Sequence, residues 1–95
     1  MILHIVNKSP YQHQALQQCL AMLSESDSVL LIEDAVLLFS NPNHHYDLPG
    51  TDRLYTLQTD CEARGVLPAP NTATLTDFNG FVDLVVSHDK SISWF

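Results

Sequence analysis

The sequence Leu3-His4-Ile5-Val6-Asn7-Lys8-Ser9-Pro10 passes directly from an apolar, β-branched segment into a signal for the start of a helix. Residues 2–6 are predicted to form a strand that ends at Asn7. Ser9 then suits the N-cap of a helix and Pro10 its first position, where the missing N–H costs nothing. The helix is expected to continue to Leu23. Its apolar face consists of residues at helical spacing, namely Leu16, Cys19, Leu20 and Leu23.

The rest of the chain repeats this alternation of strand and helix. Further strands are expected at 29–32, 53–57, 73–75 and 92–94, and helices at 33–38, from 59 to Gly65, and after Thr76 or Asp77. The last helix carries apolar residues on one face, namely Phe78, Phe81, Val82 and Val85. Five strands with four helices between them predict an α/β fold, in which a parallel sheet has helices on both faces. Residues 1–95 are expected to form a single domain.

Three local features refine this prediction. Residues 29–32 are continuously apolar, which is typical of a central strand covered on both faces. Residues 59–62 have the pattern of a capping box, and Gly65 is placed to end that helix. Residues 40–52 form the one long irregular loop.

Charge and composition exclude several function classes. The chain has 11 acidic and 4 basic residues, so its net charge is −7, and the basic residues are scattered. Because nucleic-acid binding depends largely on Lys and Arg, direct binding of RNA or DNA is not expected. We find no signal-peptide pattern and no apolar run of about 20 residues that could cross a membrane. The expected location is therefore the cytoplasm, where both cysteines stay reduced.

The two cysteines are the candidate nucleophiles, and local sequence favours packing for both. Cys19 lies in the second half of its predicted helix and on the apolar face, where the helix dipole opposes a thiolate. Cys61 lies in a first helical turn, where the dipole favours a thiolate, but Asp60 and Glu62 flank it and oppose one. With the histidines, the cysteines match no zinc spacing.

The remaining polar candidates have weaker signals. Glu33 and Asp34 follow the central strand at the edge where α/β sheets bind ligands, but the local sequence favours the alternative that they cap a helix and stay in water. His44 and His45 are adjacent in a loop and have no evident third metal ligand, so no metal is predicted. His4 is expected to be a packed, hydrogen-bonded histidine. Because the chain has no phosphate-binding glycine motif, no cofactor is predicted.

Several segments along the whole chain look familiar together. They are Leu3–Pro10, Cys19-Leu20, Val29–Val36 (Val-Leu-Leu-Ile-Glu-Asp-Ala-Val), Leu54-Tyr55-x-Leu57, Asp60 with Ala63-Arg64-Gly65, Asp77-x-x-Gly80-Phe81-Val82-Asp83-Leu84, and Trp94. In this order they resemble the DsrH/TusB family. The resemblance implies a three-layer α/β/α fold around a five-stranded parallel sheet. It also implies a heterohexamer with TusC/DsrF-like and TusD/DsrE-like subunits, which passes persulfide sulfur to a TusE-like acceptor.

The resemblance leaves two functions open for this subunit. In the first, a TusB-like subunit supports the persulfide site of its DsrE/TusD-type partner, in a pathway to 2-thiouridine at the tRNA wobble position. In the second, a DsrH-type subunit of a sulfur-oxidation complex carries persulfide on Cys19, because DsrH-type members have a cysteine at this place. No role is transferred to Cys61, His44 or His45. A stand-alone flavodoxin-like binding module, with Glu33 and Asp34 facing a small ligand, is a third hypothesis.

Overall fold

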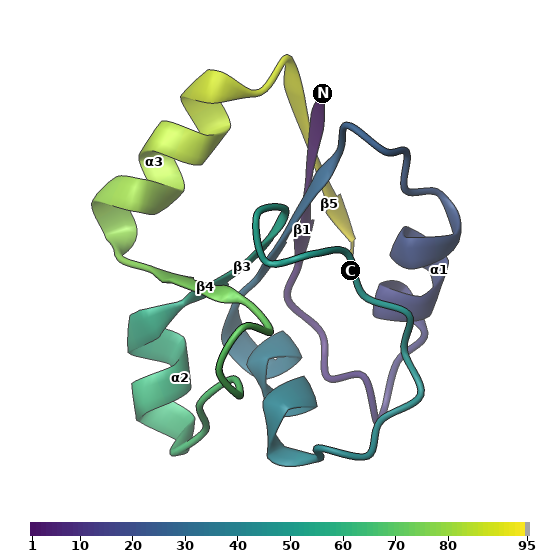
Figure 1. The fold of residues 1–95 in the computed structure, drawn as a ribbon, viewed down its shortest axis with the longest axis vertical. Helices are drawn as coiled ribbons and strands as arrows, with labels where there is room; N and C mark the ends of the chain where they lie inside the picture. The colour runs from purple at the N-terminus through teal and green to yellow at the C-terminus, as the bar shows by residue number, and fades with distance from the viewer. Residues whose placement is uncertain (95) are drawn as a thin grey trace.

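Five parallel strands form one sheet in the order β4-β3-β2-β1-β5 in the computed structural model, which describes residues 1–94 (Figure 1). The strands are β1 (Ile2–Val6), β2 (Ser28–Leu31), β3 (Leu54–Leu57), β4 (Thr74–Thr76) and β5 (Lys90–Trp94). The helices are α1 (Ala15–Ala21), the 3-10 helix η1 (Glu33–Ser40), α2 (Gln58–Arg64) and α3 (Phe78–Ser87). The predicted α/β fold with a five-stranded parallel sheet is confirmed.

The order of the strands places the helices on two faces of the sheet. From β1 to β4 the chain moves one strand at a time in a single direction, and it then returns across the sheet to place β5 beside β1. Because crossovers between parallel strands are right-handed, α1, η1 and α2 lie on one face and α3 lies on the other. This arrangement is the three-layer α/β fold.

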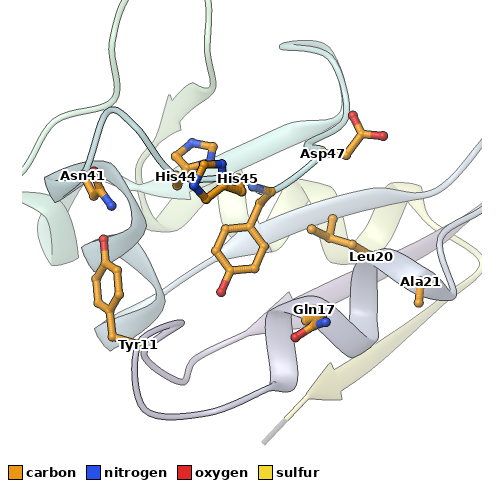
Figure 2. A pocket seen from close by; sticks show the side chains of 9 residues that line it. Tyr11, Gln17, Leu20, Ala21, Asn41, His44, His45 and Asp47 are labelled. Carbon is orange, nitrogen blue, oxygen red and sulfur yellow. Dashed lines mark hydrogen bonds between the residues drawn. The ribbon is translucent and has the colours of Figure 1, made fainter.

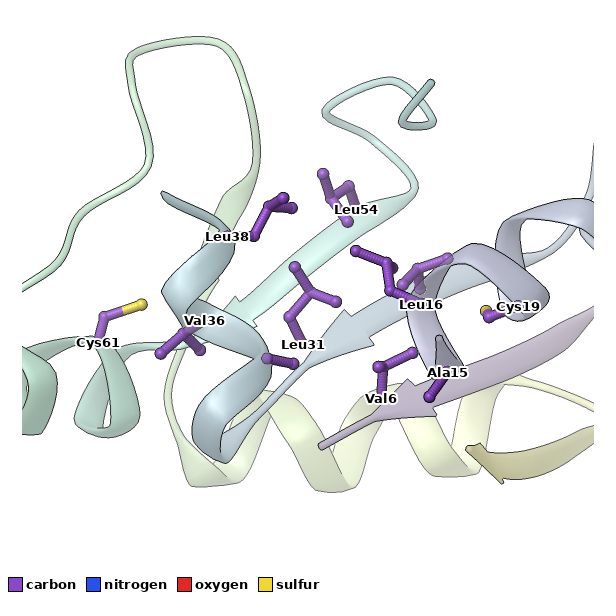
Figure 3. Packing of buried hydrophobic residues seen from close by; sticks show 11 residues of the cluster. Val6, Ala15, Leu16, Cys19, Leu31, Val36, Leu38, Leu54 and Cys61 are labelled. Carbon is purple, nitrogen blue, oxygen red and sulfur yellow. The ribbon is translucent and has the colours of Figure 1, made fainter. Parts of the chain in front are cut away.

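The hydrophobic core lies between the sheet and the first three helices. The central strand β2 is buried at all four positions, as its continuous apolar sequence predicted. Figure 3 shows the side chains that pack together there. The cluster consists of Val6, Ala15, Leu16, Cys19, Val29, Leu31, Ala35, Val36, Leu38, Leu54 and Cys61.

The predicted start of the first helix at Ser9 and Pro10 is wrong. The Ser9 hydroxyl accepts a hydrogen bond from the Tyr11 N–H (3.2 Å), which closes a single turn, and α1 begins only at Ala15. Two phenols hold this turn: the Tyr11 hydroxyl donates to the Leu37 carbonyl (3.1 Å), and the Tyr46 hydroxyl donates to the Pro10 carbonyl (3.2 Å). Because a short helix is only marginally stable alone, such tertiary contacts decide where it begins.

The predicted capping box of α2 is also wrong, whereas the predicted end of this helix is confirmed. The helix α2 begins at Gln58, so Thr59 lies inside the first turn and no side chain caps the N-terminus. Gly65 ends the helix with a left-handed backbone (φ 66°), a conformation that costs glycine little.

The last helix begins as predicted but leaves its apolar face uncovered. Asp77 is the N-cap, and its carboxylate accepts a hydrogen bond from the Gly80 N–H (2.8 Å). The α3 residues include none that is buried, and Phe78, Val82 and Val85 are exposed. Among residues 1–94, no helix is long and apolar enough to span a membrane.

Candidate functional site

Cys19 lies on the inner face of α1 and is completely buried. Figure 3 shows it beside Leu16 and Ala15, among the apolar side chains of the core. Burial, with a smaller contribution from the negative charge of Asp27, raises the pKa of the Cys19 thiol to about 12. A raised pKa disfavours the thiolate at neutral pH, and the thiolate is the form that attacks sulfur. The environment in this chain alone therefore favours the packing role, and the sulfur-carrying role stays a prediction.

Cys61 lies in α2 at the opposite end of the same cluster (Figure 3). Its sulfur is 3.3 Å from the hydroxyl oxygen of Thr56, a buried side chain of β3. Burial raises the pKa of the Cys61 thiol, and the hydrogen bond to Thr56 only partly opposes this effect. Both cysteines are free thiols, and neither has the exposed, electropositive surroundings of a reactive one.

The acidic pair at the carboxyl end of β2 is engaged with α2. The Glu33 N–H donates to the Asp60 carboxylate (2.7 Å), and Arg64 donates to the Asp34 carboxylate (3.0 Å). Glu33 also has a positive φ of 50°. The structure thus brings together four residues of the quoted motifs, but they bind one another and join η1 to α2. This arrangement does not favour the hypothesis of a small ligand at Glu33 and Asp34.

A chain of hydrogen bonds lies in the interior beside β1. The Trp94 indole N–H donates to Nδ1 of His4 (3.0 Å), and Nε2 of His4 lies 3.0 Å from the Asp27 carboxylate. Because an indole N–H is only a donor, Nδ1 must be an acceptor, which assigns the His4 proton to Nε2. The prediction of a packed, hydrogen-bonded His4 is confirmed. The sequence analysis did not predict its two partners, Asp27 and Trp94, because Asp27 lies in a segment that was interpreted only as a polar turn.

Asp27 is an anchor for several chain segments. Its carboxylate also accepts hydrogen bonds from the backbone N–H groups of Ile2 (3.0 Å) and Ser24 (3.2 Å). Burial by itself would raise the pKa of Asp27, but the hydrogen bonds from His4, Ser24 and Ile2 outweigh it and hold the pKa below its ordinary value. Asp27 is therefore a buried carboxylate that is stabilised by its partners.

The 40–52 loop forms one wall of a surface pocket of about 590 Å³, and α1 forms the other (Figure 2). His44 and His45 face the pocket from the loop, and Gln17 and Leu20 face it from α1. The remaining lining residues are Tyr11, Ala21, Asn41, Tyr46 and Asp47. The lining contains no Lys or Arg, so the pocket lacks the cations that hold phosphate or carboxylate groups.

The two histidines do not complete a metal site. The His44 ring nitrogen Nδ1 accepts a hydrogen bond from the Tyr46 N–H (3.3 Å). No group of three or more possible His, Cys, Asp or Glu ligands occurs in the part of the chain that the structure describes. Sequence reasoning missed this pocket because its tyrosines come from segments that only the fold brings together.

Comparison with known proteins gives a consistent result over the whole chain. A family model described as "DsrH like protein" matches residues 8–91. "Protein TusB" of Pectobacterium parmentieri is 35% identical over 96 aligned residues, which cover 98% of this chain and 100% of the relative. "Protein TusB" of Buchnera aphidicola subsp. Baizongia pistaciae is 32% identical, and that of Yersinia pestis (strain Pestoides F) is 31% identical, with the same coverage of both chains. The chain belongs to the DsrH/TusB family.

Proposed function

We propose that this chain is a TusB-like subunit of a cytoplasmic sulfur-relay complex, in which it supports the persulfide site of a partner and carries no sulfur itself. The observation that carries the proposal is the full-length similarity to proteins named TusB. The surroundings of the cysteines support the proposal that this chain carries no sulfur itself, because both thiols are buried and both have raised pKa values.

The partners that we propose are the TusC/DsrF-like and TusD/DsrE-like subunits, in a heterohexamer that delivers sulfur to a TusE-like acceptor. The pathway is 2-thiolation of the tRNA wobble uridine. With a net charge of −7, this chain is poorly suited to hold tRNA itself, so contact with nucleic acid falls to other components.

Co-expression with the TusC/DsrF-like and TusD/DsrE-like subunits, which we call the two sibling chains, tests this proposal. A tag on this chain should recover both siblings, and size-exclusion chromatography with mass measurement should give one complex that contains all three chains. The control is the same tag on an unrelated α/β protein. If the chain elutes alone as a stable monomer and recovers neither sibling, the proposed function is wrong.

The second candidate function is a DsrH-type carrier in sulfur oxidation, and the position of Cys19 in α1 is the feature that favours it. Incubation of the isolated chain with a persulfide donor, followed by measurement of cyanide-labile sulfur, distinguishes the carrier function from the supporting function. A carrier requires labelling that Cys19→Ser removes and Cys61→Ser leaves. The supporting role requires equal labelling in the wild type and in both variants.

A further inference from the structure

The helix α3 presents an apolar face to solvent. Its side chains are strongly exposed: Phe78 is 69% exposed, Val82 45%, Val85 39% and Val86 78%. We call these four residues the α3 face. Each of the other helices buries at least one residue in the core, whereas α3 buries none. In Figure 1, α3 lies at the outside of the molecule, with no described segment over its outer side. A contiguous apolar patch of this kind is typical of an interaction surface.

Both ends of α3 are capped, and its C-terminal end is joined to the sheet. At the start, the Asp77 cap accepts from the Gly80 N–H (2.8 Å). At the end, the buried His88 ring donates from Nδ1 to the Leu84 carbonyl (2.7 Å) and bonds through Nε2 to the Ser28 hydroxyl of β2 (3.0 Å). The bond from His88 to Ser28 joins the end of the helix to β2, and with α3 in this position the four residues of the α3 face are exposed.

The spacing of the exposed residues makes them a single surface. Phe78, Val82 and Val85 follow one another at i, i+4 and i+7, so they lie along one side of the helix, and Val86 adjoins them. Phe81 is less exposed and lies against Phe78, with ring centroids 6.1 Å apart. Phe81 therefore packs against Phe78 at the N-terminal end of the α3 face.

The charges around the α3 face indicate what kind of surface it would fit. Asp77 and Asp83 lie on the helix or at its cap, and no Lys or Arg occurs between residues 65 and 89. A second copy of this chain would bring acidic residues against acidic residues, with a net charge of −7 on each copy. Anionic lipid head groups would be repelled for the same reason. An apolar surface that is flanked by Lys or Arg is complementary.

We propose that the α3 face is the docking surface for a sibling subunit, which contributes an apolar surface with basic residues at its rim. This inference rests on the proposed function, because it assigns the sibling to one side of this chain.

Single substitutions in the full chain, co-expressed with the siblings, test the inference. Val86→Glu places a charge on the face, and we expect the Kd for the sibling to rise at least about tenfold. Asp83→Lys should raise it about threefold to tenfold, with a larger effect at low salt. Met22→Glu is the matched control, because Met22 is 69% exposed but lies at the end of α1, and it should change the Kd less than about twofold. Circular dichroism should show unchanged folding in all three variants.

The outcomes separate this inference from the function on which it rests. If the wild type binds a sibling, and Val86→Glu and Met22→Glu bind it equally well, the docking surface is wrong while the proposed function stands. If the wild type binds neither sibling, both fail. Wild-type self-association or binding to anionic vesicles that Val86→Glu abolishes would assign the α3 face to another occupant and overturn the inference.

Discussion

Asp27 shows how much of this fold depends on one buried carboxylate. It accepts hydrogen bonds from the backbone of Ile2 and Ser24 and from the ring of His4, which in turn accepts from Trp94. The carboxylate thereby ties the first strand, the turn before the central strand and the last strand together. Loss of its charge leaves buried donors without a strong acceptor.

We predict that Asp27→Asn lowers the free energy of unfolding by about 2 kcal/mol, because hydrogen bonds to a buried charge are the strong ones. Urea unfolding followed by Trp94 fluorescence measures this change. Asp34→Asn is the matched control, since the Asp34 side chain is 60% exposed, and it should cost less than about 0.5 kcal/mol. Equal effects of the two substitutions would contradict the anchoring role.

The same residue should give the chain a dependence on acid. The pKa of Asp27 is lowered from the ordinary value of 3.8, so the native state binds fewer protons than the unfolded state there. Its contribution is complete above that value and is lost as the pH falls below it. The free energy of unfolding should therefore fall between about pH 4 and pH 2, and less steeply in Asp27→Asn. Identical slopes in the two proteins would show that other carboxylates dominate.

The cysteines give a second prediction at this scale. Because both thiols are buried and their pKa values are raised, iodoacetamide at pH 8 should label them at least about 100-fold more slowly in the native chain than in urea. Mass spectrometry of the modified chain gives both rates. Cys61→Ser isolates the signal of Cys19. Rapid labelling of native Cys19 would mean that it is accessible and would favour the carrier role.

At the scale of the element, strands were easier to predict than helix ends. Each of the five strands lies within two residues of its predicted bounds. For β1, β2 and β3 the reason is that short apolar and β-branched runs pack in the buried part of the sheet, whereas β4 and β5 are its exposed edge strands. The start of α1 could not be predicted, since it depends on Tyr11 and Tyr46, whose partners lie far away in the sequence. The exposure of α3 could not be predicted either, because an apolar face does not reveal what covers it.

Two of the predicted helix caps, Asp77 and Thr59, allow a direct comparison of sequence signals with structure. Asp77→Ala should lower the free energy of unfolding by about 1 kcal/mol, because it removes the hydrogen bond to the Gly80 N–H. Thr59→Ala should change it by less than about 0.5 kcal/mol, because Thr59 lies inside α2 and caps nothing. Thermal or urea unfolding of the wild type and both variants measures these changes in the free energy of unfolding. An equal loss in both would mean that the capping box forms in solution.

At the scale of the whole molecule, the sequence was sufficient to predict the family and the fold. It was not sufficient to predict which residues maintain the fold and which line the pocket or form the exposed apolar surface. The quoted motifs run in order along the chain, and the family comparison agrees with them. In space, motif residues such as Asp34, Asp60 and Arg64 bind one another, so they maintain the fold. The candidate nucleophile is buried, the pocket lies beside a loop with no motif, and the apolar surface lies on the last helix.

The central claim is that this chain supports a sulfur-carrying partner without carrying sulfur itself. The most direct test is cyanide-labile sulfur per assembled complex, measured after loading with a persulfide donor, for complexes built with wild-type chain or with Cys19→Ser. The account predicts equal amounts of labile sulfur and equal transfer to the TusE-like acceptor in both complexes. Loss of labile sulfur or of transfer with Cys19→Ser, in a complex of unchanged mass, would contradict it.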